Sequence, residues 1–308
     1  MCLTVYGSQG EAAVQSAQAE LNRLERLLSR TRDSSEISRL NAHAGDGTWV
    51  SLEPETAELL AFARSVWETL PGDFDVTIAP VMDAWGFGGE ACRVPDADEL
   101  AGRLSLVDSG RLAVDPERTA ARLEEAGMAA DLGAVAKGFA AGRAAQCILD
   151  AGASSALLDL GRNITVLGDG PSGSLWRVAV TDPRDTSRYL GVVSMRDQTA
   201  STSGGYERYF EEDGVRYHHI IDPKTGYPAD SGLLSVTVVS PDPQLADALS
   251  TALFVAGKEQ ALAVWRSGEN FELVLCGEDG TVTVTEGLED RFQFRGEDNG
   301  YTCEIARR

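Results

Sequence analysis

The sequence predicts an α+β fold of helices and antiparallel strands, and two periodic patterns carry this prediction. Residues 11–30 place apolar side chains three and four positions apart, which is typical of an amphipathic helix. Residues 176–181 and 189–195 alternate apolar and polar side chains, which is typical of paired antiparallel strands with one buried face. The chain has 308 residues, of which 43% are hydrophobic, so it can fill the core of one large domain or of two ordinary ones.

The N-terminal part predicts helices separated by turns. Residues 31–41 contain a cluster of serines and aspartates that indicates a capped turn and a brief helix, and Pro54 occupies a favoured first position of another helix. The elements predicted here are a strand at residues 3–6, the helix at 11–30, a brief second helix within 31–41, a helix at 54–70, a helix at 97–104 and a hairpin through Val114.

Residues 131–163 predict a turn, a helix, a strand and a second turn. Apolar residues at helical spacing follow Asp131-Leu132-Gly133-Ala134, Gly152 supplies a stop signal, and residues 156–160 form an apolar run of strand length. The first N–H groups of a helix have no intrahelical partners, so this helix start can hold an anion, and Lys137 adds a positive charge there. Small residues before a helix also permit close packing, and the pattern alone leaves both interpretations open.

The C-terminal half predicts a hairpin around Asp213-Gly214, because this dipeptide between two strand-like runs is a strong hairpin signal. The other elements predicted in this half are a strand at residues 233–239, a helix at 244–255 that begins after Pro241-Asp242-Pro243, and two or three strands from Phe271 to a peripheral C-terminus.

Residues 73–89 place two carboxylates, Asp73 and Asp75, on either side of Phe74 and then interleave aromatic residues with glycines. This composition suits a planar ring system, which needs both stacking and polar contacts at its edge. The alternative is an irregular loop that Trp85 and Phe87 pin into the core.

The predicted helix at 244–255 is apolar except where Asp247, Ser250 and Thr251 interrupt it. Their spacing places all three oxygen-bearing side chains on one face, where a hard cation such as Mg²⁺ can bind them. A lone aspartate in an apolar environment is costly unless it is paired or metal-bound. The alternative is that this face is simply solvated.

The histidines and cysteines do not predict a transition-metal site. His218 and His219 are adjacent, and because successive strand residues point to opposite faces, only one of them can face a given site. The five cysteines are scattered and lack CxxC spacing, so neither a disulfide framework nor a zinc site is expected.

The charge of the chain excludes some classes of partner. With 48 acidic and 27 basic residues the net charge is −21, which opposes binding to nucleic acid or to an anionic membrane surface. No apolar run is long enough to insert into a membrane. The first 30 residues lack a secretory signal, so a cytoplasmic location is expected of the chain as written; an extracytoplasmic location is the alternative if a segment upstream of the strand at 3–6 is missing, and the sequence leaves the location open.

Four motifs together resemble the ApbE family, the FAD:protein FMN transferases, and occur in the family's order. They are DFDVTIAPVMDAWGFG, DLGAVAKGFAAGRA with LLDLGRNI, STSGGYERYF with HHIIDPKTGYP, and LADALSTALFVAG. Weaker likeness in Ser29–Asn41 and in the terminal strands extends the resemblance over nearly the whole chain. It implies one domain over residues 1–308, an α/β/α sandwich of the T-fold type with antiparallel sheets and flanking helices. Its FAD site is expected between two halves, about 1–165 and 166–308.

The resemblance also implies an activity: FAD is bound with Mg²⁺ on its pyrophosphate, and FMN passes to a threonine hydroxyl of an acceptor protein with release of AMP. The implied metal ligands are Asp247, Ser250, Thr251 and the backbone carbonyl of Ala134. The implied FAD contacts are Thr31, Asp73, Phe74, Asp75, Asp131, Lys137 and the backbone at Ile221. We hypothesise that His219 accepts the proton of the attacking hydroxyl; Asp247, or direct loss of the proton to water, is the alternative.

Two other functions use the same residues. The first is an FAD pyrophosphatase that releases FMN and AMP to water, and the second is a non-catalytic FAD carrier, against which the retained metal-ligand set argues. No segment matches the acceptor signature of an Asp followed by Ser/Thr-Gly-Ala-Thr, so self-modification is not expected.

The sequence departs from the family pattern at three places. Arg162 stands where the family commonly has glycine, and the family's N-terminal Met-Gly-Thr is not recognisable at Met1–Thr4. Thr31 stands where some relatives carry an aromatic residue that covers the flavin, and a smaller residue there favours hydrolysis.

Overall fold

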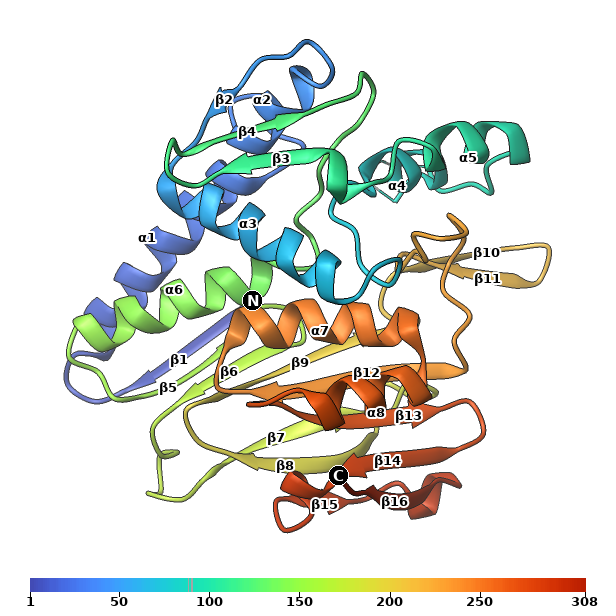
Figure 1. The fold of residues 1–308 in the computed structure, drawn as a ribbon. Coiled ribbons are helices and arrows are strands. Elements are labelled where there is room, and N and C mark those ends of the chain that lie inside the picture. The colour runs from blue at the N-terminus through green and yellow to red at the C-terminus, as the bar shows by residue number, and fades with distance from the viewer. Residues whose placement is uncertain (88, 90) are drawn as a thin grey trace. The chain divides into compact units, whose positions relative to one another are not determined.

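We describe the protein from a computed structural model that covers residues 1–87, 89 and 91–308. The chain divides into two units, each built from separate segments (Figure 1). Unit 1 comprises Met1–Asn22, Lys137–Tyr206 and Asp230–Arg308, and unit 2 comprises Arg23–Ala136 and Glu207–Ala229. Gly88 of the predicted aromatic and glycine-rich loop lies outside the described residues. The prediction of one domain with two halves, about 1–165 and 166–308, stays a prediction.

Unit 1 is built on an eight-stranded sheet in the order β1-β5-β6-β9-β12-β13-β14-β16. Neighbouring strands are antiparallel except β14 and β16, which are parallel. The strands are β1 (Cys2–Tyr6), β5 (Ser155–Asp159), β6 (Asn163–Leu167), β9 (Gln198–Gly204), β12 (Leu233–Ser240), β13 (Glu272–Gly277), β14 (Thr281–Thr285) and β16 (Thr302–Ala306).

The two faces of this sheet are covered differently (Figure 1). On one face, α1 (Gly10–Leu28) and α6 (Ala136–Asp150) share an apolar cluster with β5, and α7 (Pro243–Ala256) packs on β9 and β12. On the other face lies a three-stranded sheet in the order β15-β8-β7, formed by β15 (Phe292–Phe294), β8 (Tyr189–Met195) and β7 (Trp176–Thr181). Helix α8 (Lys258–Ser267) follows α7 and contacts it.

In its described residues, unit 2 combines four α-helices with two small sheets. Its elements are α2 (Glu36–Ala42), α3 (Pro54–Thr69), α4 (Ala79–Trp85), α5 (Ala97–Leu104), a sheet of β2 (Val50–Ser51), β4 (Ala120–Leu123) and β3 (Leu112–Asp115), and the hairpin β10 (Tyr209–Glu212) with β11 (Val215–His218). Trp85 is fully buried, and its Nε1 donates a hydrogen bond to the Gly226 carbonyl at 2.7 Å. The indole thereby joins α4 to the segment that follows the hairpin.

The predicted α+β class is confirmed, as are the helices α1, α2, α3, α5, α6 and α7 and both predicted hairpins. Two predictions about local structure were wrong, and one helix was missed. The segment interpreted as a loop before Phe87 contains α4, which is only seven residues long and therefore too short to show a helical period. The segment after Phe271 forms four strands and not two or three; the last of them, β16, is a largely exposed edge strand, so the C-terminus is peripheral as predicted. Helix α8 was not predicted.

Within the described residues, no helix is both long enough and apolar enough to cross a membrane.

Candidate functional site

Helix α7 carries a buried polar face. Its start is fixed by Asp242, whose carboxylate accepts hydrogen bonds from the backbone N–H groups of Gln244 at 2.9 Å and Leu245 at 3.2 Å. One turn further on, the side chains of Asp247 and Ser250 lie inside the protein, each residue only 1% exposed, and Thr251 beside them is partly buried. The interpretation of this face as solvated was therefore wrong.

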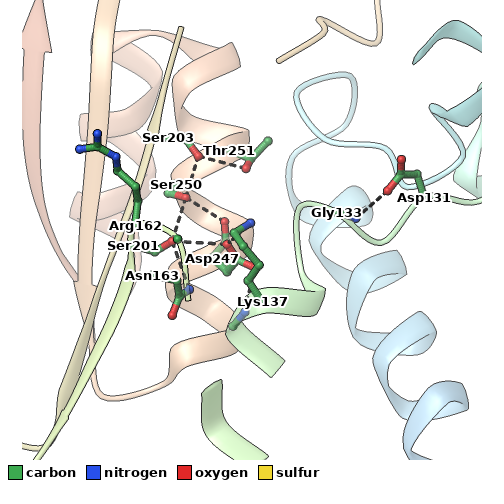
Figure 2. Close-up of polar contacts among 12 residues, drawn as sticks. Asp131, Gly133, Lys137, Arg162, Asn163, Ser201, Ser203, Asp247, Ser250 and Thr251 are labelled. Atoms are coloured by element: carbon green, nitrogen blue, oxygen red, sulfur yellow. Dashed lines mark hydrogen bonds and ion pairs between the residues drawn. The ribbon is translucent and has the colours of Figure 1, made fainter. Parts of the chain in front are cut away.

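Strand β9 supplies two hydroxyls to the same cluster (Figure 2). Ser201 and Ser203 are two residues apart, so their side chains leave the same face of the strand, toward α7. The Ser203 hydroxyl lies 2.9 Å from the Ser250 Oγ and 3.2 Å from the Thr251 Oγ1. The Ser201 hydroxyl lies 3.4 Å from both the Asp247 Oδ1 and the Ser250 Oγ. Serine and threonine hydroxyls both donate and accept, so this group can reorient around a bound ligand.

The carboxylate of Asp247 lies at the start of α6. Its Oδ2 accepts a hydrogen bond from the Gly138 N–H at 2.8 Å, and its Oδ1 lies 3.2 Å from the Lys137 ammonium, whose side chain is 43% exposed. A Cβ on Gly138 would come within 2.6 Å of the Asp247 Cβ and 2.2 Å of the Pro243 carbonyl oxygen. Only glycine permits this approach. The anion held at this helix start is thus the protein's own carboxylate, and both the close-packing and the anion interpretations of the small residues apply.

The donor atoms of this cluster suit a hard divalent cation. They are one carboxylate and several hydroxyl oxygens, which are the ligand types that Mg²⁺ and Ca²⁺ prefer. Among the residues that the structure describes, no group of three His, Cys, Asp or Glu side chains is placed to hold a metal. The described residues therefore form neither a site of histidine and cysteine ligands, which bind softer metals, nor a site of several carboxylates.

In unit 2, the predicted FAD contact Asp73 is paired with a lysine far along the chain. The Lys224 ammonium donates a hydrogen bond to the Asp73 Oδ1 at 2.6 Å, and Asp73 is 8% exposed. This hydrogen bond raises the pKa of Lys224 above its ordinary value, although partial burial opposes the shift.

The carboxylate of Asp75 is occupied by its own surroundings. Its Oδ1 accepts hydrogen bonds from the Thr77 N–H at 2.7 Å, the Thr77 hydroxyl at 2.6 Å and the Ser109 hydroxyl at 2.7 Å. Its Oδ2 accepts from the Ser109 N–H at 2.9 Å. Four donors converge on one side chain, so Asp75 holds the segment before α4 to residues 108–109 of the same unit.

Asp131 is held in a similar way. Its Oδ1 accepts a hydrogen bond from the Gly133 N–H at 2.7 Å, and its Oδ2 lies 2.7 Å from the Arg30 Nε. Arg30 also donates to the Asp83 Oδ1 at 2.8 Å. Burial lowers the pKa of Arg30, but the two carboxylates outweigh this effect and the pKa is raised.

The other predicted FAD contacts in unit 2 differ in exposure. Thr31 is exposed, and its hydroxyl lies 3.1 Å from the Ser29 hydroxyl. The side chains of Phe74 and Ile221 are buried, 2% and 6% exposed. Ile221 also bridges to Pro228 through the backbone. Burial of Phe74 supports the interpretation in which the aromatic residues of this segment pack into the core.

The two adjacent histidines have different partners. His218 is engaged on both ring nitrogens, with Nε2 at 3.1 Å from the Ala229 carbonyl and Nδ1 accepting from the Ile220 N–H at 3.3 Å. The Nδ1 of His219 lies 3.2 Å from the Arg208 carbonyl oxygen, which can only accept. This contact assigns the proton to Nδ1 and the lone pair to Nε2 in the neutral imidazole.

The structure brings together Lys137, Asp247, Ser250 and Thr251, all of unit 1 (Figure 2). The remaining predicted site residues, Thr31, Asp73, Phe74, Asp75, Asp131, Ala134, His219 and Ile221, belong to unit 2. Their roles stay predictions.

Sequence reasoning missed several members of these networks, namely Arg30, Asn163, Ser201, Ser203 and Lys224. Ser201 and Ser203 could have been predicted from the sequence as a pair, because two hydroxyls at a spacing of two residues share one face of a strand. Arg30 and Lys224 carry no such signal, since their partners lie far away in the sequence.

The sequence and the fold were compared with known proteins. The model of the ApbE family matches residues 1–275. A protein of Treponema pallidum named FAD:protein FMN transferase is 38% identical, over 94% of this chain and 84% of that protein. One of the same name from Klebsiella pneumoniae is 32% identical, over 96% of this chain and 90% of that protein.

Solved structures agree with these matches. The ApbE protein of Thermotoga maritima superposes with a TM-score of 0.86 at 31% identity, covering 93% of this chain and 94% of that one. The flavinyl transferase ApbE of Pseudomonas stutzeri gives a TM-score of 0.82 at 30% identity, covering 94% and 92%. The family model spans most of the chain, and the relatives and structures agree with it. The chain therefore belongs to the ApbE family.

Proposed function

We propose that this protein transfers the FMN part of FAD to a threonine hydroxyl of an acceptor protein and releases AMP. The names of the curated relatives, FAD:protein FMN transferase, support the reaction. The observation that carries the proposal is the cluster of the buried Asp247 and Ser250 with the partly buried Thr251, because a site that only stores a flavin does not need a buried carboxylate surrounded by hydroxyls.

The reaction exchanges one phosphorus–oxygen bond for another. The threonine oxygen forms a bond to the phosphorus on the FMN side of the pyrophosphate, and the bond from that phosphorus to the bridging oxygen breaks. AMP departs with the bridging oxygen, and the hydroxyl proton passes to a base. Catalysis of such a transfer depends on positioning and on stabilising charge at the phosphoryl oxygens.

We assign Mg²⁺ to the α7 cluster, with Asp247, Ser250 and Thr251 as the residues that hold it. The donor chemistry supports this assignment, and so does the buried Oδ1 of Asn163 beside the cluster, which has no hydrogen-bond partner among the described residues. A bound divalent cation supplies positive charge to the phosphoryl oxygens and to the leaving phosphate. Lys137 supplies a second positive charge, which is half-exposed beside the Asp247 carboxylate.

His219 is the base in this proposal. The contact of its Nδ1 with the Arg208 carbonyl leaves the lone pair on Nε2, the atom that would accept the threonine proton. Replacing His219 by alanine is expected to slow a single turnover of FMN transfer about 100-fold, the lower end of what general base catalysis contributes. Transfer at the wild-type rate in this variant would assign the proton to another acceptor.

The proposed function is tested by incubating the protein with FAD, Mg²⁺ and an acceptor domain, and then separating the products under denaturing conditions. Flavin fluorescence that stays with the acceptor supports transfer, and an acceptor whose target threonine is replaced by alanine serves as the control. FMN and AMP released into solution, with no labelled acceptor, would instead identify a pyrophosphatase. Unchanged FAD would identify a flavin carrier.

A further inference from the structure

Asn163 lies next to the proposed cation site, and none of the roles assigned so far uses its side chain as a ligand or a base. It is the first residue of β6, directly opposite Ser201 of β9 in the sheet register, and its side chain is completely buried. Its Nδ2 donates a hydrogen bond to the Ser201 Oγ at 3.3 Å, whereas its Oδ1 has no hydrogen-bond partner among the described residues (Figure 2).

The hydrogen bond from Asn163 determines what Ser201 can do. A hydroxyl that accepts from an amide keeps its own proton to donate. Two acceptors lie at 3.4 Å from the Ser201 Oγ, the Asp247 Oδ1 and the Ser250 Oγ, and the ionised carboxylate is the stronger acceptor. The direction of donation therefore runs from Asn163 through Ser201 to Asp247.

The next pair along the same two strands shows that the lone Oδ1 is not a general property of this interface. Thr165 and Thr199 face each other two residues away, and their buried hydroxyls satisfy one another at 2.7 Å. A buried carbonyl without a partner is costly to the folded state, and such costs are usually retained where a ligand supplies the missing partner.

We propose that Asn163 is a positioning residue of the cation site: it orients the Asp247 carboxylate through Ser201, and its Oδ1 accepts a hydrogen bond from a water molecule that enters with the divalent cation. Mg²⁺ usually keeps several waters when it binds to protein, so such a donor accompanies the ion. This inference rests on the metal assignment of the proposed function.

The inference is tested by Mn²⁺ binding to the purified protein without FAD or acceptor, measured from the electron paramagnetic resonance signal of free Mn²⁺. Asn163→Leu keeps the approximate size of the side chain and removes both polar atoms. It is expected to weaken Mn²⁺ binding about tenfold, the usual effect of removing a group that orients a ligand. Ser201→Ala removes only the path from Asn163 to Asp247 and is expected to weaken binding by a smaller or equal factor. The double variant should lose no more than Asn163→Leu alone, about tenfold and not about 100-fold, because Asn163 acts on Asp247 through Ser201.

Thr165→Val is the matched control, since it removes a buried hydrogen bond between the same strands outside the site, and its Mn²⁺ affinity should equal that of the wild type.

A purely structural role for Asn163 predicts a different pattern, in which metal-free Asn163→Leu unfolds at a lower temperature than the wild type but binds Mn²⁺ with the wild-type affinity. Wild-type Mn²⁺ affinity in Asn163→Leu would overturn the inference, and so would additive losses of affinity in the double variant. If Asn163→Leu does not fold, wild-type Mn²⁺ affinity in Ser201→Ala would overturn it. If the wild type binds Mn²⁺ no better than Asp247→Ala, the metal assignment itself fails, and this inference fails with it.

Discussion

The carboxylates of the two units differ in burial and in their surroundings: the side chain of Asp247 in unit 1 is 2% exposed, whereas Asp75 and Asp131 in unit 2 are partly buried. In unit 2, Asp75 receives four hydrogen bonds from Thr77 and Ser109, and Asp131 is held by Arg30 and by a backbone N–H group. In unit 1, Asp247 has one backbone donor and one half-exposed lysine, and its other neighbours are hydroxyls. The first set holds loops in place, and the second can exchange partners.

This difference indicates where a cation can bind. Asp131 would have to give up its bonds to coordinate a metal, because its donors are an N–H group and a guanidinium, which cannot accept. Asp75 has two hydroxyl donors but also two backbone N–H donors, whose bonds it would likewise lose. Hydroxyls can turn their protons away and offer lone pairs to the metal instead. Of these three carboxylates, Asp247 is therefore the one that can take a cation with the least loss of hydrogen bonds, because it has one backbone N–H donor and hydroxyls beside it.

The largest effect is expected for Asp247→Asn. The amide oxygen can still accept from the Gly138 N–H, so the fold should persist, while the charge that holds the cation is lost. Single-turnover FMN transfer is expected to fall at least about 1,000-fold, because the metal contributes several kcal/mol to such reactions. The matched control is Asp242→Asn on the same helix, where asparagine caps as well as aspartate. Comparable loss in both variants would mean that the effect lies in the helix and not in the site.

Asp75→Ala tests the other side of the comparison. Removing this carboxylate leaves two backbone N–H groups and two hydroxyls without their acceptor, so the free energy of unfolding should fall by about 2–4 kcal/mol. Denaturant titration measures this loss. The folded fraction should still bind Mn²⁺ as the wild type does, and loss of Mn²⁺ binding without loss of stability would make Asp75 a ligand.

The ion pair of Lys224 and Asp73 should matter less, because the Lys224 side chain is 56% exposed. Lys224→Met is expected to lower the free energy of unfolding by less than about 1 kcal/mol at neutral pH. The pKa of Lys224 is raised in the folded state from an ordinary value of 10.5. Its contribution is therefore fully present below pH 10.5 and is lost as the pH rises through the raised pKa. A stability difference that grows above pH 10.5 would contradict this assignment.

The smallest effect is expected for Arg162→Gly. Gly161 and Arg162 form the turn between β5 and β6, and both have positive φ, at 75° and 67°. Glycine removes a strain of about 1 kcal/mol, but it also gives up the contact of the guanidinium with the Tyr206 ring, 5.2 Å from its centroid, and the hydrogen bond to Thr181. These effects nearly cancel, so the midpoint temperature of thermal denaturation should shift little in Arg162→Gly. In Arg162→Val the midpoint temperature should be clearly lower than in the wild type. A large change in Arg162→Gly would show that one of the two contacts dominates.

The sequence predicted most of the long elements and the shared face of Asp247, Ser250 and Thr251 on α7. The spacing of Asp247, Ser250 and Thr251 lies within one helix, so periodicity alone places them together. The positive φ of Arg162 could not be predicted from the sequence, because it is a conformation that glycine adopts without strain and that other residues seldom adopt.

The residues that surround the carboxylates could not be predicted, because sheet register and long-range pairing decide them. Asn163 meets Ser201 through the register of β6 and β9, and Lys224 lies 151 residues from Asp73. Local patterns contain no information on such distances. Helix α4 was missed for a different reason: its seven residues are too few to display a period.

The most direct test of the account is the position of bound Mn²⁺, determined from anomalous scattering in crystals of the protein soaked with the ion. The account predicts a peak within about 2.6 Å of the Asp247 carboxylate and next to the hydroxyls of Ser250 and Thr251. A peak on Asp75 or Asp131, with none at Asp247, would contradict it.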